Sequence, residues 1–294
     1  MQTEADSSRV PIRNAPGVLM KLTVYAPLLL IVLSAGAFEA PIRAQVPPPD
    51  VQIRLEDPQE ARGSRSSWSR YRNRYPGPIP TPEDWEPPEG TVRIALQAGH
   101  WKADEAPREL RGLRNNGTSW RDTPEWEVNL AIAEEAATLL KELGYEVDIL
   151  PAVVPPGYRA HLFIAIHADG SGDSGASGYR VATPRRDATG RASDFAELLE
   201  ASYGKETGLR QLPDVTRRMQ NYYAFNFRRY EHALHPMTIG VIIETGFLTS
   251  PRDRRVILDD PERAAKGIVE AVKAYSVTPP PGGTGSREPE VRHP

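Results

Sequence analysis

Proline is distributed very unevenly along this chain of 294 residues. Residues 1–90 and 277–294 hold 19 of the 29 prolines in 108 positions, whereas residues 91–276 hold ten in 186 positions. Each proline fixes φ and removes a backbone hydrogen-bond donor, so the flanks are difficult to accommodate in a packed core. We therefore expect a single folded domain over residues 91–276, which is long enough to bury a sizeable core.

The N-terminal 44 residues contain a targeting pattern. Residues 22–37 form a nearly uncharged apolar run that follows Lys21 and ends in Ala35-Gly36-Ala37. A short apolar run that ends in small residues favours a cleaved signal peptide, and an uncleaved membrane anchor is the alternative. We expect residues 1–44 to be an N-terminal extension with this signal or anchor. Either version predicts an exported protein, located in the periplasm, in the cell wall or outside the cell.

Residues 45–90 carry ten prolines and should form an extended, semi-rigid linker. Within this linker, residues 64–77 interleave four arginines with Trp68, Tyr71 and Tyr75. A segment of this kind either contacts a membrane or an anionic wall polymer or is simply solvated, and both interpretations stay open. Residues 277–294 are expected to be a disordered tail.

Charge and cysteine content exclude several classes of protein. The 36 basic and 39 acidic residues give a net charge of −3, whereas nucleic-acid-binding proteins usually have a large basic excess. The chain has no cysteine, which excludes disulfides, thiolate catalysis and thiolate metal sites. Histidine and carboxylate side chains are left as the strong ligands for any metal. We expect a monomer that does not bind nucleic acid.

Residues 91–276 alternate short apolar runs with helical stretches, which predicts an α/β fold on a largely parallel sheet. The strands are expected at residues 92–96, 146–150, 161–166, 179–182 and 239–243, and the helices at about 125–143, 191–204 and 261–274. Thr123-Pro124 should provide the N-cap and first residue of the first helix, and Gly144 should end it.

Three of the apolar runs end in an ionisable residue. IALQAGH ends at His100, LFIAIH at His167 and VIIE at Glu244. In open α/β sheets, ligands bind outside the carboxyl ends of the strands. Any one of these residues alone is as easily a satisfied polar group at a strand end, but the three together predict a shared site.

Two histidines and one carboxylate form a known catalytic zinc set that leaves one coordination position open. The missing ligand should come from the helix that starts near residue 125, which offers Glu125 and Glu127. At 100° per residue these side chains point about 200° apart, so only one can face the core. Glu125 falls on the apolar stripe of Val128, Ile132, Ala136, Leu139 and Leu143, and we therefore expect Glu125 to be the ligand. A carboxylate outside the ligand set could then act as the base.

Four motifs in this region resemble those of the zinc-dependent N-acetylmuramoyl-L-alanine amidases of type 3, which are peptidoglycan hydrolases. They are GHW at 99–101, EWEVNLAIA at 125–133, HLFIAIHADG at 161–170 and VIIETGFLTS at 241–250. The resemblance implies a single α/β domain with a roughly six-stranded sheet flanked by helices. It also implies Zn²⁺-dependent cleavage of the amide between N-acetylmuramic acid and L-alanine.

Carried over by position, the zinc ligands of the family fall on His100, Glu125 and His167, and its catalytic glutamate falls on Glu244. The chain also departs from the family pattern, because Gln97 stands where the family usually has Asp. Carboxylates that contact metal-bound histidines orient them, so Gln97 either weakens zinc binding or leaves this role to another residue.

Several further residues are candidates for binding substrate. Trp101 either lines the cleft and stacks on a sugar or is simply packed. Residues 221–236 are either a helix with a charged face or a substrate wall, in which Tyr222, Asn226 and Arg229 would grip glycan or peptide carboxylates. His235 is a further candidate, as a group that stabilises the oxyanion.

Two alternatives to the amidase remain at this point. One is a zinc peptidase that acts on stem peptides, and the other is a wall-binding module with a degenerate site. The GSGDSG string at residues 170–175 is expected to be a loop rather than a dinucleotide site, because no helix pattern opens there.

Overall fold

The computed structural model describes residues 75, 77–81, 85–114, 117–173 and 175–275. The predicted signal or anchor at 22–37, nearly all of the arginine-rich segment 64–77 and the tail 277–294 lie outside these residues. No helix of the described part is long and apolar enough to cross a membrane.

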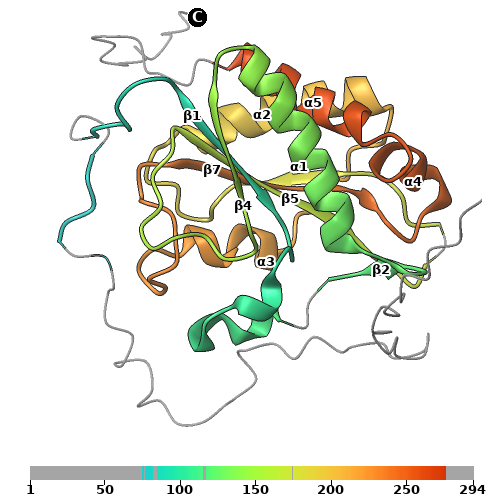
Figure 1. Ribbon diagram of the computed structural model, residues 1–294, viewed down its shortest axis with the longest axis horizontal. Helices are drawn as coiled ribbons and strands as arrows, with labels where there is room; N and C mark the ends of the chain where they lie inside the picture. The colour runs from blue at the N-terminus through green and yellow to red at the C-terminus, as the bar shows by residue number, and fades with distance from the viewer. Residues whose placement is uncertain (1–74, 76, 82–84, 115–116, 174, 276–294) are drawn as a thin grey trace, which may run out of the picture. The chain divides into compact units, whose positions relative to one another are not determined.

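The described residues build a single α/β domain on a five-stranded sheet (Figure 1). Its strands lie in the order β4-β1-β5-β7-β6, and all are parallel except β6, which pairs antiparallel with β7. The bounds are Arg93–Ala98 for β1, Glu146–Leu150 for β4, Leu162–Asp169 for β5, Arg180–Ala182 for β6 and Ile239–Phe247 for β7. The largely parallel sheet is as expected. A separate two-stranded ribbon of β2 (Ser119–Trp120) and β3 (Thr123–Pro124) stands beside the five strands.

Five α-helices and three 3₁₀ segments accompany the sheet within the described part of the chain. They are α1 (Glu125–Glu142), α2 (Ala192–Thr207), α3 (Arg217–Gln220), α4 (Pro251–Ile257) and α5 (Pro261–Ala274), with 3₁₀ turns at Ala103–Glu105, Arg108–Leu113 and Tyr223–Phe225. The helices α1, α2 and α5 lie on one side of the sheet and α3 on the other (Figure 1). The three longest helices were all expected from the sequence.

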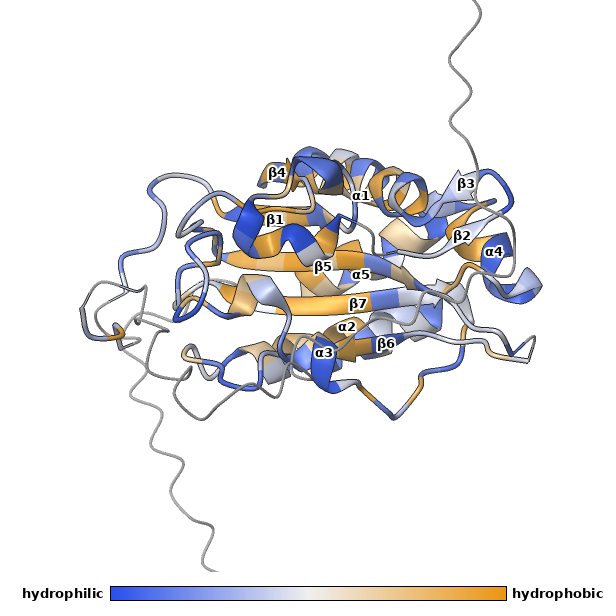
Figure 2. Ribbon diagram, turned by 90° about the horizontal axis from the view of Figure 1, so that it is seen from below, coloured by the Kyte–Doolittle hydropathy of each residue, from blue (hydrophilic) through white to orange (hydrophobic). Residues whose placement is uncertain are grey.

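Alternate strand residues pack into two separate cores, one on each face of the sheet. Leu96, Ile166 and Ile243 belong to the core beneath α1, α2 and α5. Phe163 and Ile242 belong to the core on the side of α3. Figure 2 shows β5 and β7 as hydrophobic along most of their length and more hydrophilic toward one end. Gln97, His167 and Glu244 lie an even number of residues from core residues Ala95, Phe163 and Ile242 of their own strands. Their side chains therefore belong to the face of the sheet on the side of α3.

The helix α1 differs from its prediction at both ends. Pro124 is the N-cap, in an extended conformation, and Thr123-Pro124 form β3 instead of the first helical turn. The helix ends before Gly144, as predicted, and this glycine adopts a φ of 89°. Leu143, expected on the buried stripe, is the C-cap of the helix and is 49% exposed, so that prediction is wrong.

A buried carboxylate fixes the turn that follows β7. Asp253 in α4 has no exposed surface. It accepts hydrogen bonds from the Ser177 hydroxyl at 2.5 Å and from the backbone N–H groups of Gly178 and Phe247 at 2.9 Å each. The carboxylate therefore ties the end of β7 to the loop that precedes β6.

Candidate active site

The first histidine of the site follows the end of β1 in a strained conformation. His100 has a φ of 63°, which is unusual for a residue with a side chain. The preceding Gly99 donates its N–H to Ile166 O at 2.9 Å, so the chain passes directly beside β5. A Cβ at position 99 would lie 2.4 Å from Cε1 of His167. Glycine is required here because the backbone lies against the imidazole ring.

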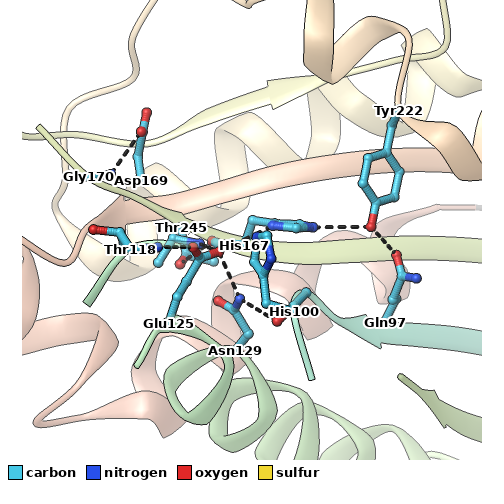
Figure 3. A network of polar contacts seen from close by, with 12 residues as sticks. Gln97, His100, Thr118, Glu125, Asn129, His167, Asp169, Gly170, Tyr222 and Thr245 are labelled. Carbon is cyan, nitrogen blue, oxygen red and sulfur yellow. Dashed lines mark hydrogen bonds and ion pairs between the residues drawn. The ribbon is translucent and has the colours of Figure 1, made fainter. Parts of the chain in front are cut away.

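His100, Glu125 and His167 converge at the carboxyl ends of β1 and β5 (Figure 3). Oε1 of Glu125 lies 3.2 Å from Nδ1 of His167 and 3.5 Å from Nε2 of His100. One ligand atom from each residue lies within 4.8 Å of the other two. The structure therefore brings together the three residues that the sequence predicted, and it excludes Glu127, which is exposed on the other face of α1.

Neighbouring donors hold the Glu125 carboxylate in place. Asn129, one helical turn later, donates from Nδ2 to Oε1 at 3.1 Å and also to Gly99 O. The backbone N–H groups of Ala168 and Thr118 donate to Oε1 and Oε2 at 3.1 and 2.9 Å. Glu125 is thus fixed by α1, β5 and the segment before β2. The sequence analysis assigned no role to Asn129, although its spacing of four residues from Glu125 places the two side chains next to each other on a helix.

The electrostatics of this cluster favour a neutral His100 and an ionised Glu125, whereas they favour protonation of His167. Burial lowers the pKa of His100 to about 4, which keeps its imidazole neutral. Burial alone would raise the pKa of Glu125, but the hydrogen bond and charge of His167, together with His100, hold it down at about 2. The carboxylate is therefore ionised. Burial acts to lower the pKa of His167, whereas the hydrogen bond and charge of the Glu125 carboxylate raise it. The pKa of His167 is raised on balance.

Two of the three distances between the candidate ligand atoms match those expected around a zinc ion. A tetrahedral site with N and O ligands at roughly 2.1 Å has edges of roughly 3.4 Å. The distances from Glu125 Oε1 to the two imidazole nitrogens, 3.2 and 3.5 Å, match such edges. Two neutral nitrogens and one carboxylate oxygen are also the donor set that zinc takes in hydrolases.

Glu244 lies beside this cluster on the next strand. It is the direct register partner of His167 across β5 and β7. Its side chain is partly buried, and no hydrogen bond or ion pair of its carboxylate is found among the described residues. Burial raises the pKa of Glu244 to about 8, against the opposing charge of His167. A carboxyl group with a pKa near neutrality is suited to exchange protons.

Arg180 extends this row of residues and was not singled out from the sequence. It is the register partner of Glu244 across β6 and β7, and its guanidinium pairs with Asp169 at 3.1 Å. The charge of Arg180 acts to lower the pKa of Glu244, and that of Asp169 acts to raise it. Only the strand pairing reveals this arrangement, because β6 has three residues and gives a weak sequence pattern.

Part of the domain matches a known family model. Residues 156–274 match the model of the N-acetylmuramoyl-L-alanine amidases of type 3. This stretch of the chain is therefore similar to the type 3 amidases. The matched residues include His167 and Glu244. His100 and Glu125 precede them and join the site through the geometry described above. No curated protein matches the chain by sequence.

Two solved structures are similar to this chain at low sequence identity. The catalytic domain of CwlV, an N-acetylmuramoyl-L-alanine amidase from Bacillus (Paenibacillus) polymyxa var. colistinus, is 21% identical, with a TM-score of 0.42 over 63% of this chain and 97% of that chain. The amidase Ami1 from Mycobacterium smegmatis is 18% identical, with a TM-score of 0.45 over 62% and 95% of the two chains.

The structure brings only some of the candidate substrate-binding residues to the site. Tyr222 reaches the site, with its hydroxyl 3.3 Å from Nε2 of His167. Trp101 packs against the core beneath α1, with the Lys102 ammonium 4.7 Å above its ring. Residues 221–236 form a 3₁₀ turn and loops, so the helix considered for them is absent.

Asn226 and Arg229 line a basic pocket adjacent to Tyr222. The pocket has a volume of about 210 Å³, and its walls carry four arginines and no acidic side chain: Arg185, Arg186, Arg228 and Arg229. Asn226 donates from Nδ2 to the carbonyls of Asn221 and Tyr222, so it shapes this loop. The loop therefore connects the pocket to the residue that contacts His167.

His235 is not brought to the site. It precedes β7 and lies at the amino edge of the sheet, whereas Glu244 lies near the carboxyl end of that strand. Its ring stacks on that of Trp85, with 4.8 Å between the ring centroids, and its Nε2 lies 3.1 Å from the Tyr75 hydroxyl. Burial lowers its pKa to about 4. His235 is therefore not placed to stabilise an oxyanion. It packs against the segment that precedes β1.

Proposed function

We propose that this domain hydrolyses the bond between the lactyl group of N-acetylmuramic acid and L-alanine in peptidoglycan, with a zinc ion held by His100, Glu125 and His167. The convergence of two imidazole nitrogens on one buried carboxylate oxygen, at 3.2 and 3.5 Å, carries this proposal. The match of residues 156–274 to the N-acetylmuramoyl-L-alanine amidase model supports the choice of peptidoglycan as substrate.

Each residue of the site has a role in the proposed reaction. A bound zinc ion lowers the pKa of water and polarises a carbonyl group. Glu244 accepts a proton from the attacking water and returns it to the leaving nitrogen. The position of Glu244 directly beside His167 across β5 and β7 supports this role. Asn129 and Thr118 keep Glu125 oriented.

The basic pocket is proposed to hold the stem peptide. Carboxylates of the peptide are the anionic groups closest to the scissile amide, and arginine binds them through paired donors. Arg229 and Asn226 line this pocket. Trp101 is proposed only as a wall of the cleft, since the structure shows it packed against the core.

Export of the protein and a division into extension 1–44, linker 45–90, catalytic domain 91–276 and tail 277–294 are part of the same proposal. A hydrolase of peptidoglycan must reach the wall, and residues 22–37 have the composition of a signal or anchor. A monomer is expected.

The test combines metal content with digestion of isolated cell walls. Wild-type protein should bind one zinc ion and release L-alanine peptides together with free lactyl-muramic ends. Glu125→Ala should lose the metal and Glu127→Ala, its solvent-facing control, should keep it. Glu244→Gln should keep the metal and lose the activity. Cleavage within the peptides would instead identify a zinc peptidase. Zinc-loaded protein that binds walls without cleaving them would identify a wall-binding module.

A further inference from the structure

Gln97 is a fully buried side chain whose amide orientation is fixed by its neighbours. Its Nε2 lies 3.1 and 3.2 Å from the carbonyl oxygens of Pro151 and Ala152, and 2.8 Å from the Tyr223 hydroxyl. Carbonyl oxygens only accept hydrogen bonds, so the NH₂ group of Gln97 must face them. The carbonyl oxygen of Gln97 must then point the other way, toward Tyr222.

The direction of the next hydrogen bond follows from this orientation. The Tyr222 hydroxyl lies 2.8 Å from Oε1 of Gln97, and since Oε1 can only accept, Tyr222 donates its single proton there. The same hydroxyl lies 3.3 Å from Nε2 of His167 (Figure 3). With its proton already used, the Tyr222 oxygen can only accept from this nitrogen.

We propose that Gln97 and Tyr222 form a relay that keeps the proton of neutral His167 on Nε2 and so leaves the lone pair of Nδ1 free to bind the metal. This inference rests on the proposed zinc site. The nitrogen on the other side of the ring faces the metal cluster, since Nδ1 lies 3.2 Å from Oε1 of Glu125. Gln97 and Tyr222 are positioning residues, because they act through His167.

The relay gives a physical reason for glutamine where the family usually has aspartate. A carboxylate at position 97 could accept the Tyr222 proton, but it could not donate to the carbonyls of Pro151 and Ala152. Burying it against these two oxygens would bring a negative charge close to two carbonyl oxygens and would remove the donor to Pro151 O, while Ala152 O would keep its hydrogen bond from the Tyr223 hydroxyl. In this chain Gln97 both donates to the carbonyls of Pro151 and Ala152 and accepts the Tyr222 proton. The Tyr222 hydroxyl then makes the contact that orients His167.

The first test uses the wild-type chain loaded with zinc. Nitrogen NMR of ¹⁵N-histidine-labelled protein should show His167 with a protonated Nε2 and a metal-bound Nδ1. Zinc bound through Nε2 of His167 would overturn the relay, whatever the activity of the protein.

The second test measures zinc affinity by competition with a chelator. Tyr222→Phe removes only the hydroxyl and should weaken zinc binding by about 10–100-fold, the usual effect of losing a partner of a metal-bound histidine. Gln97→Met should have a similar effect through Tyr222. Tyr179→Phe is the matched control, because this buried hydroxyl donates to Glu200 O, away from the site, and it should bind zinc like wild type.

The outcomes separate the relay from the proposed function. If wild type binds zinc and digests walls while Tyr222→Phe binds zinc equally well, the relay is wrong and the amidase proposal stands. If wild type binds no zinc, the proposed function fails and the relay fails with it.

Discussion

Replacing Gly99 by alanine tests whether the site depends on the close approach of β1 to the His167 ring. The new Cβ would lie 2.4 Å from Cε1 and 2.6 Å from both nitrogens of His167. Ordinary contact begins at 3.4 Å, so the ring or the backbone must move by about 1 Å. Gly99 has no positive φ, so this substitution acts through the clash rather than through backbone strain.

The expected effect on metal binding is much larger than the effect on folding. Overpacking of this size costs about 1–3 kcal/mol of unfolding free energy. Metal–ligand distances tolerate only about 0.2 Å, so a ring displaced by about 1 Å no longer fits the site. We expect Gly99→Ala to bind zinc at least about 100-fold more weakly. Chelator competition measures the affinity, and urea unfolding of the metal-free protein measures the stability.

Gly112→Ala is the matched control. Gly112 lies in the 3₁₀ segment Arg108–Leu113, and a Cβ there would meet no atom within 4 Å. Gly112→Ala should change neither the zinc affinity nor the unfolding free energy. Zinc affinity of Gly99→Ala equal to that of wild type would refute the reasoning, because it would mean that the ring does not need its present position to bind metal.

Three further predictions concern stability. Since the pKa of Glu244 is raised from 4.5 to about 8, its contribution to the stability of the metal-free protein is present below pH 4.5 and is lost as pH rises through 8. The loss is on the order of 5 kcal/mol, and pH-dependent urea unfolding should show it in wild type but not in Glu244→Gln. Asp253→Ala should lower the unfolding free energy by at least about 3 kcal/mol, because three donors lose their buried acceptor; a loss below 1 kcal/mol would contradict this. Trp85→Ala should cost about 1–2 kcal/mol through the lost stacking on His235, with wall digestion unchanged; reduced digestion would connect this segment to the site.

The elements that the sequence predicted best are those with a strong local pattern. The apolar runs that stop at His167 and Glu244 predicted β5 and β7, although the two strands continue to Asp169 and Phe247. Parallel pairing then placed both residues at one edge of the sheet. The choice of Glu125 over Glu127 followed from the helical period alone, and Glu125 is only 4% exposed.

The contacts that the sequence did not predict depend on residues far apart in the chain. Gln97 and Tyr222 are 125 residues apart, and no periodicity links them. Arg180 meets Glu244 only because β6 runs antiparallel to β7. His235 was misplaced because it is close to Glu244 in sequence. At about 3.3 Å per residue, the extended strand between Ile239 and Glu244 alone separates its two ends by roughly 17 Å.

The packing of Trp85 on His235 also sets the direction from which the chain enters the domain. Residues 85–92 reach β1 at the amino edge of the sheet, whereas His100, His167 and Glu244 lie at the opposite, carboxyl edge. A support, tag or fusion partner attached ahead of residue 85 is therefore joined to the back of the domain. The edge that carries the proposed metal ligands is therefore not the edge at which residues 85–92 enter the domain.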